Sequence, residues 1–327
     1  MPVSSVAIGV DIGGTGTKGG LVDLTGNVLV REEHPTDPQA ATKTTIEVVE
    51  RLIERARELD VVPVAAGIGA AGFIDFAQGR VNFSPNVVYD DPEVADAVSS
   101  RTDLAVVVDN DANAAVWGER AFGSAQGLKD VALLILGTGL GAGFIVDGHL
   151  LRGRTGAGAE FGHTVVDMGG PACGCGLRGC IEQYASGQAI ARLGREAAAE
   201  DPTTSILTFA GSVESITAYD VARAARELDE TARAVLRTAG RALGVAMSNV
   251  ANLFDPEAIV LAGNVIGAGE PLLGPARDAL AEMTEAQRRR PLRVLVSKLG
   301  PDAGIIGAAA LALEELDAGG SRSVRDA

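Results

Sequence analysis

Short apolar runs alternate with glycine-rich turns in the first third of the chain. Five such runs are Val6–Val10, Leu21–Asp23, Asn27–Val30, Val64–Gly69 and Ala105–Asp109. Apolar runs of this length, bounded by turn residues, are typical of strands. The first three lie close enough together for an antiparallel meander. The pattern predicts one α/β half that ends near Asn110.

One helix is predicted within this half, over Thr44–Leu59. Its apolar residues recur at helical spacing, at Ile46, Val49, Ile53 and Ala56. Thr44 is followed three residues later by Glu47, which predicts a capping box at the start of the helix.

The pattern of strand, Gly/Thr turn and strand occurs a second time. Val131–Leu136 is apolar and leads through a glycine-rich turn into an extended segment that continues to Val146. Val6–Val10 leads into Gly13–Thr15 in the same way. This weak internal repeat predicts a duplicated α/β unit with two phosphate-facing turns opposite each other.

The rest of the chain continues the alternation of helices and strands. Asp220–Phe254 is alanine-rich and predicted helical, Ala258–Ala262 and Arg293–Ser297 are predicted strands, and Ile305–Leu316 is a predicted final helix. Alternating strands and helices predict the α/β fold class.

Length and charge limit the possible functions. At 327 residues, two domains or one large α/β unit are expected. The formal net charge of −15 argues against a nucleic-acid partner, because binding one needs basic surface. The sequence shows neither an apolar run long enough to cross a bilayer nor a secretory signal. We therefore expect a cytoplasmic protein with no nucleic-acid or membrane partner.

All three cysteines, Cys173, Cys175 and Cys180, lie within eight residues, and His163 lies ten residues upstream of the first. Three thiolates and one imidazole complete a tetrahedral structural Zn²⁺ site that has no open position for reacting water. A disulfide with a spare thiol, or three unrelated buried cysteines, are the alternatives. The odd count argues against the first alternative and the clustering against the second.

A glycine-rich turn follows the first predicted strand. Backbone N–H groups in such a turn can bind phosphate without side chains in the way. Candidate residues are Asp11, Gly13, Gly14, Thr15, Thr17 and Lys18. Asp11 belongs near phosphates only with Mg²⁺ between them, because carboxylate and phosphate repel each other. An ordinary hairpin turn is the alternative.

The second turn also matches the permissive dinucleotide fingerprint, through Gly137, Gly139 and Ala142. That fingerprint should open a helix, whereas Gly143–Val146 continues as a strand-like run, so a nicotinamide site is the weaker hypothesis. The sequence contains no Walker-type phosphate loop.

Asn110, Asp111 and Asn113 follow the strand Ala105–Asp109, and ligands bind at the carboxyl ends of strands in α/β sheets. A carboxylate there can act as a general base toward a substrate hydroxyl that attacks a phosphoryl group. The alternative is that Asp109, Asn110 and Asp111 simply cap the helix that starts near Ala112.

Glu160, His163 and Glu182 flank the cysteines. Carboxylates can bind the several hydroxyls of a sugar through charge-assisted hydrogen bonds. Two carboxylates are also typical of a glycosidase, but phosphate-binding turns have no place in glycoside hydrolysis.

Taken together, these motifs resemble the ROK family (repressor, open reading frame, kinase), and most closely its actinobacterial-type, zinc-containing glucokinases. The motifs are Asp11–Thr15, Asn110–Asn113, Leu136–Gly139, and the block from Glu160–His163 to Cys180–Glu182. The resemblance implies an actin-like, hexokinase-type ATPase fold of two α/β domains, residues 1–110 and 111–302. It implies that a C-terminal helix at about 303–317 joins the first domain and that a zinc-binding insert at 156–186 belongs to the second.

The resemblance also implies roles for individual residues. Asp111 is implied as the general base on the 6-hydroxyl of glucose, with ATP and Mg²⁺ as cofactors. The implied sugar-binding residues are Gly72, Asn86, Asn110, Asp111, Glu160, His163 and Glu182. The ATP phosphates are expected on Gly13–Thr15 and on Gly137, Thr138 and Gly139, and the adenosine near Gly263 and Asn264.

Other members of this family are possible. Thr17-Lys18-Gly19-Gly20 resembles the first phosphate turn of polyphosphate-using glucokinases, so polyphosphate is a second candidate donor after ATP. Kinases of N-acetylhexosamines or fructose are alternatives because pocket shape selects the sugar. A sugar-responsive repressor needs a helix-turn-helix, and only ten residues precede Asp11. We expect a homo-oligomer, a dimer or a tetramer.

Overall fold

The computed structural model describes residues 4–285, 289 and 292–325. Its contacts group the chain into two compact units. Unit 1 comprises Met1–Lys129, Gly143–Ala159 and Ser297–Ala327, and unit 2 comprises Asp130–Ala142 and Glu160–Val296.

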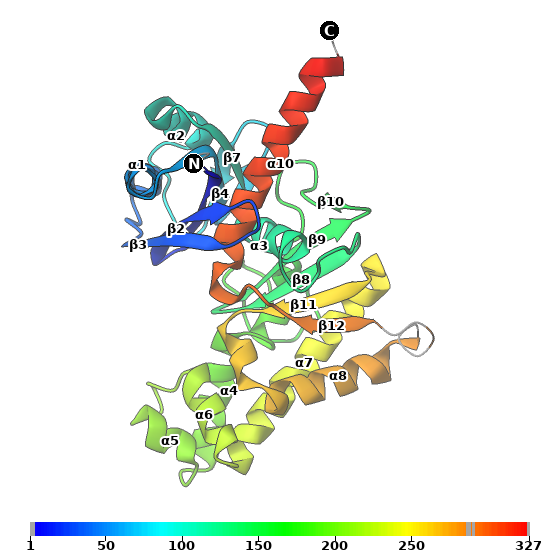
Figure 1. Ribbon diagram of the computed structural model, residues 1–327. Helices are drawn as coiled ribbons and strands as arrows, with labels where there is room; N and C mark the ends of the chain where they lie inside the picture. The colour runs from blue at the N-terminus through cyan, green and yellow to red at the C-terminus, as the bar shows by residue number, and fades with distance from the viewer. Residues whose placement is uncertain (1–3, 286–288, 290–291, 326–327) are drawn as a thin grey trace. The chain divides into compact units, whose positions relative to one another are not determined.

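Unit 1 contains a five-stranded sheet of order β3-β2-β1-β4-β7 (Figure 1). Its strands are β1 (Ser4–Ile12), β2 (Gly16–Asp23), β3 (Val28–Pro35), β4 (Val61–Ala70) and β7 (Ala105–Asn110). The predicted meander is confirmed, because β2 pairs antiparallel with both β1 and β3. β1, β4 and β7 run parallel, so their carboxyl ends lie at one edge of the sheet.

Helices cover both faces of this sheet (Figure 1). Alternate residues of a strand point to opposite faces. Val6 and Ile8 of β1 join a core with α1 (Ala41–Glu58) and α2 (Val94–Thr102), whereas Ala7 joins a core with α10 (Ala303–Arg325). A Cβ on Gly9 would lie 1.9 Å from the Ile305 carbonyl oxygen, so α10 approaches β1 closely only because residue 9 is glycine.

The predicted capping box of the first helix is wrong. The helix α1 begins at Ala41, with Ala40 as N-cap and no side-chain cap bond, and Thr44 lies inside it. The Asp90 carboxylate instead accepts hydrogen bonds from Thr42 N (3.0 Å) and Lys43 N (3.3 Å). Asp90, which is distant in sequence, therefore accepts hydrogen bonds from the first N–H groups of the helix. The predicted capping box gave this role to the Thr44 side chain.

The second five-stranded sheet has the order β10-β9-β8-β11-β12. Its strands are β8 (Val131–Leu136), β9 (Leu140–Val146), β10 (His149–Leu150), β11 (Ala258–Ala262) and β12 (Arg293–Val296). β8, β11 and β12 run parallel. In the first sheet β1 is central, with β2 and β3 on one side and β4 and β7 on the other. In the second sheet β8 is central, with β9 and β10 on one side and β11 and β12 on the other. This shared topology supports the predicted repeat.

Unit 2 also contains the helices α4 (Gly187–Glu200), α5 (Ser205–Ala210), α6 (Ala218–Arg226), α7 (Glu230–Phe254) and α8 (Glu270–Met283). The helical region predicted at Asp220–Phe254 is thus two helices. The chain breaks at Leu228, whose φ is +68°, and Asp229 caps α7 by accepting a hydrogen bond from Ala232 N at 2.8 Å.

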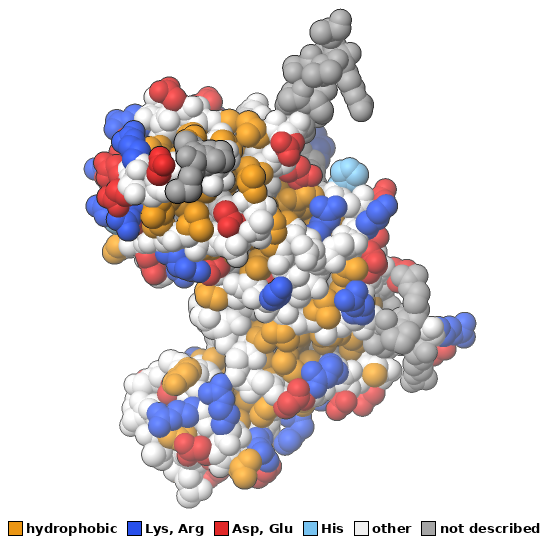
Figure 2. Space-filling model, viewed as in Figure 1, with side chains coloured by type: hydrophobic (Ala, Val, Ile, Leu, Met, Phe, Trp, Pro, Cys, Tyr) orange, Lys and Arg blue, Asp and Glu red, His pale blue; other side chains and the backbone are white. Residues whose placement is uncertain are grey.

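Unit 1 also contains a β5–β6 hairpin (Phe73–Asp75 and Arg80–Phe83) and the helix α3 (Asp111–Ala121). No helix in the described part of the chain is long and apolar enough to cross a membrane. Figure 2 shows acidic and basic side chains interspersed over the visible face, so the acidic excess of 43 over 28 residues does not form one patch there.

Candidate functional site

The turn from β7 into α3 holds Asp111. Asn110 is the N-cap of α3, and its Oδ1 accepts hydrogen bonds from Ala112 N (2.9 Å) and Asn113 N (3.2 Å). Its Nδ2 donates to the Gly72 carbonyl oxygen at 3.2 Å. Asn110 therefore caps α3, and Asp111 is the half-buried first residue of the helix. The positive end of the helix dipole favours a carboxylate there.

Tyr89 was not singled out by the sequence motifs. Its hydroxyl donates to the Ala71 carbonyl oxygen at 3.3 Å. Burial raises the pKa of Tyr89, and the negative charges of Asp111 and Asp11 raise it further. The phenol therefore stays protonated close to both carboxylates.

The first glycine-rich turn, Gly13–Gly16, joins β1 to β2 and is closed by a Gly13 N to Gly16 O hydrogen bond of 3.0 Å. Thr17 lies in β2 with its buried hydroxyl 2.9 Å from that of Thr36, which donates to the Gly13 carbonyl oxygen at 2.8 Å. Two threonines therefore fix the shape of the turn, and its tip at Gly14 and Thr15 is exposed.

Charged and polar residues adjoin this turn. Asp11 lies opposite Lys18 in the β1–β2 pairing. Burial raises the pKa of Asp11, and the ammonium of Lys18 opposes this rise. A Cβ on Gly14 would lie 3.9 Å from the Cβ of Asn86, which places Asn86 beside the turn.

The second turn, Gly137–Gly139, joins β8 to β9. The Gly137 carbonyl oxygen accepts from Gly187 N (2.8 Å) and that of Thr138 from Gln188 N (3.2 Å), so the start of α4 fixes the turn. β9 follows as a strand, which argues against the dinucleotide alternative. A Cβ on Gly263, whose φ is +93°, would lie 2.3 Å from the Leu136 carbonyl oxygen. Gly263 and Asn264 thus follow β11 next to the end of β8.

His163, Cys173, Cys175 and Cys180 come together in unit 2, with their ligand atoms all within 4.8 Å of one another. Cys173 Sγ lies 3.6 Å from His163 Nδ1, and Cys175 Sγ lies 3.6 Å from Cys180 Sγ. Ligands at zinc bond lengths of about 2.3 Å in a tetrahedron are roughly 3.8 Å apart. The donor set and spacing therefore fit zinc, and no described cysteine forms a disulfide.

Both predicted glutamates lie beside this cluster. Glu182 Oε1 is 3.0 Å from Cys173 Sγ and 3.5 Å from His163 Nδ1. Burial raises the pKa of Glu160, while His163 lowers it and Glu182 raises it. The structure thus brings together Glu160, His163 and Glu182. Since His163 turns Nδ1 toward the sulfur atoms, a metal bound there leaves Nε2 for another ligand.

The predicted residues divide between the two units. Gly72, Asn86, Asn110, Asp111 and the first turn belong to unit 1, and the second turn, the cysteine cluster, both glutamates, Gly263 and Asn264 belong to unit 2.

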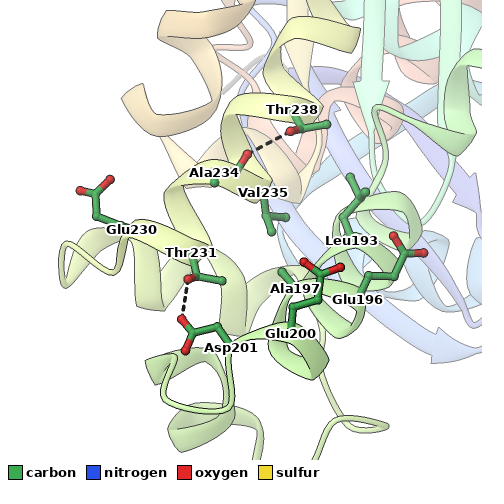
Figure 3. Close-up of a pocket in the computed structure, with 10 residues that line it drawn as sticks. All are labelled: Leu193, Glu196, Ala197, Glu200, Asp201, Glu230, Thr231, Ala234, Val235 and Thr238. Atoms are coloured by element: carbon green, nitrogen blue, oxygen red, sulfur yellow. Dashed lines mark hydrogen bonds between the residues drawn. The ribbon is translucent and has the colours of Figure 1, made fainter.

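A separate hollow of about 540 Å³ lies between α4 and α7 (Figure 3). Its lining residues are Leu193, Glu196, Ala197, Glu200, Asp201, Glu230, Thr231, Ala234, Val235 and Thr238. Asp201 accepts a hydrogen bond from Thr231 at 2.7 Å. None of the predicted site residues is among these lining residues.

Comparisons with known proteins give a consistent result. The model of the ROK family matches residues 7–315. The chain is 38% identical to a glucokinase of Streptomyces coelicolor and 37% identical to one of Thermotoga maritima, in each case over 94% of this chain and 98% of the relative.

The fold also matches a solved structure. A ROK family glucokinase from Streptomyces griseus, solved in complex with glucose and AMPPNP, is 40% identical, with a TM-score of 0.82 over 94% of this chain and 99% of that one. The two mixed α/β sheets therefore form the actin-like, hexokinase-type fold found in ROK glucokinases. The chain belongs to the ROK family.

Proposed function

We propose that this protein is a glucokinase that transfers the γ-phosphoryl group of ATP to the 6-hydroxyl of glucose. The similarity to glucokinases over 94% of the chain carries this proposal. The solved relative of Streptomyces griseus was crystallised with glucose and AMPPNP, an acceptor and a nucleotide of the kinds proposed here.

Asp111 is proposed as the general base. It is the first residue of α3, follows the cap residue Asn110, and stands at the carboxyl edge of parallel strands. In this role it accepts the proton of the sugar 6-hydroxyl as that oxygen attacks the phosphoryl group. Asn110, Gly72 and Asn86 are proposed to contact the sugar from unit 1.

The remaining sugar hydroxyls are proposed to form hydrogen bonds with Glu160, His163 and Glu182. Carboxylates suit this task because charge-assisted hydrogen bonds are stronger than neutral ones. The zinc ion, when bound, holds the loop and the tautomer of His163 and takes no part in the reaction. His163 then presents Nε2 to the sugar.

The two glycine-rich turns are proposed to bind the phosphates of ATP through backbone N–H groups. Asp11 and Lys18 are proposed to act with Mg²⁺, which removes the repulsion between the Asp11 carboxylate and phosphate. Gly263 and Asn264 are proposed to lie near the adenosine. A homo-oligomeric state stays a prediction.

A coupled assay with glucose, mannose, fructose and N-acetylhexosamines, each with ATP and with polyphosphate, tests this function. The proposal expects the highest kcat/KM for glucose with ATP. A higher value for an acetamido sugar or for polyphosphate would replace the proposed acceptor or donor.

A further inference from the structure

Asp109 is a buried carboxylate two residues before Asp111, and its side chain is only 2% exposed. Its Oδ1 accepts hydrogen bonds from Asn110 N (2.8 Å) and Asn113 Nδ2 (2.9 Å). It therefore ties together residues on either side of Asp111. The Oδ1 atom of Asn113 is buried with no partner among the described residues, so the bond to Asp109 decides how that amide is oriented.

Arg152 neutralises this buried charge. Its Nε donates to Asp109 Oδ2 at 2.8 Å, and its guanidinium lies over the Phe76 ring, 3.6 Å from the ring centroid. The backbone at Arg152 is also fixed, because its carbonyl oxygen accepts from Gly158 N at 3.1 Å. A flat, stacked guanidinium with a defined donor direction is a rigid support for a carboxylate.

The positive charge of Arg152 also acts on Glu314. Burial raises the pKa of Glu314, and the positive charges of Arg120 and Arg152 oppose the rise. An Arg152 variant therefore changes the surroundings of two carboxylates, Asp109 and Glu314, and the effects of the two must be separated by experiment.

We propose that Arg152, acting through Asp109, is a positioning residue that holds the turn carrying Asn110 and Asp111. Without the guanidinium, Asp109 keeps an unpaired buried charge, which is costly. It relieves this cost by turning toward water. This change weakens its bonds to Asn110 and Asn113, and Asp111 moves with the turn. The inference rests on the proposed function for its catalytic consequence.

The test compares Arg152→Met with Arg152→Lys, and uses Arg154→Met and Glu314→Gln as controls. Arg154 is an exposed cation two residues further on. We expect Arg152→Met to lower kcat by about a hundredfold, with a smaller rise in KM, because misplacing a reacting group by about 1 Å costs on this order. Arg152→Lys restores kcat only in part, because it keeps a cation beside Asp109 but loses the flat, stacked guanidinium, and both controls keep the wild-type kcat.

Hydrogen exchange of the Ala112 and Asn113 amides gives a second readout that does not need activity. Both amides are bonded to Asn110 Oδ1, and we expect them to exchange faster in folded Arg152→Met. Unchanged exchange, a wild-type kcat, or a kcat that falls only in proportion to the unfolded fraction would overturn the inference. If the wild-type protein does not phosphorylate glucose, the proposed function fails, while the amide exchange still decides whether Arg152 holds the turn.

Discussion

At the scale of single residues, Glu182 connects two parts of unit 2. Its Oε1 lies 3.0 Å from Cys173 Sγ. A Cβ on Gly139 would lie only 2.7 Å from its Oε2. The missing side chain at residue 139 therefore leaves room for the carboxylate. A residue proposed for the sugar thus packs against the turn proposed for the phosphates.

Gly139→Ala should therefore impair sugar binding as well as phosphate binding. The added methyl group displaces the Glu182 carboxylate, so we expect KM for glucose to rise more than KM for ATP. Gly141→Ala is the control, because a Cβ there would lie 3.9 Å from the nearest heavy atom, Ile135 Cβ. Steady-state kinetics with each substrate varied in turn measures both constants. A rise in KM for ATP alone would contradict this explanation.

At the scale of elements, α3 is fixed at both ends. Asn110 caps its start, and near its end the fully buried Glu119 holds the segment that leads into α10. Glu119 Oε1 accepts hydrogen bonds from Ser297 Oγ (2.6 Å) and Leu299 N (3.0 Å), and Oε2 accepts from Ser124 N (2.7 Å). Burial alone would raise the pKa of Glu119, but these hydrogen bonds outweigh it and lower the pKa.

A lowered folded-state pKa gives a pH-dependent contribution to stability. The contribution is present above the unfolded-state pKa of about 4.3 and is lost as the pH falls through the folded-state value. Glu119→Gln should lower the free energy of unfolding by about 1–3 kcal/mol at pH 7, and the difference from wild type should narrow in acid. Urea unfolding at several pH values, with exposed Glu47→Gln as control, tests this. A difference that stays constant or widens in acid would contradict it.

The limits of sequence prediction are also visible at this scale. The apolar runs in the sequence correctly predicted β1, β4, β7, β8 and β11, because the residues of a buried strand are themselves apolar. The cap of α1 was missed because Asp90 lies 48 residues from Thr42. Arg152 was missed for the same reason, since 43 residues separate it from Asp109. Contacts between residues that are distant in sequence leave no signal in the local pattern of apolar and polar positions.

At the scale of the whole molecule, the two sheets share one strand order, which the strand–turn–strand repeat indicated in advance. The cysteine cluster was also predictable, because its ligands lie close together in sequence and their types are characteristic of zinc. Two other features could not be predicted, because they depend on how separate segments fold together. They are the contacts of Tyr89 and the packing of Glu182 against Gly139.

The cysteine cluster gives a prediction about stability. We expect one zinc per chain by atomic emission, and a lower Tm after treatment with a chelator, because the metal ties together a loop with little core of its own. Cys175→Ser should show a similar Tm to the chelated wild type. Cys175 is exposed, so its replacement leaves no core cavity. A chelator that lowers the Tm of Cys175→Ser as much as that of the wild type would contradict a zinc site formed by these four ligands.

Asp111 is the proposed general base that takes the proton from the 6-hydroxyl of glucose. The most direct measurement compares Asp111→Asn with the wild type by ATP-dependent kinetics and by calorimetric glucose binding. Exposed Asp96→Asn serves as control. We expect a kcat lower by about 10²–10⁴-fold with glucose affinity and Tm little changed, because only proton acceptance is removed. An Asp111→Asn enzyme that keeps most of its kcat would contradict it.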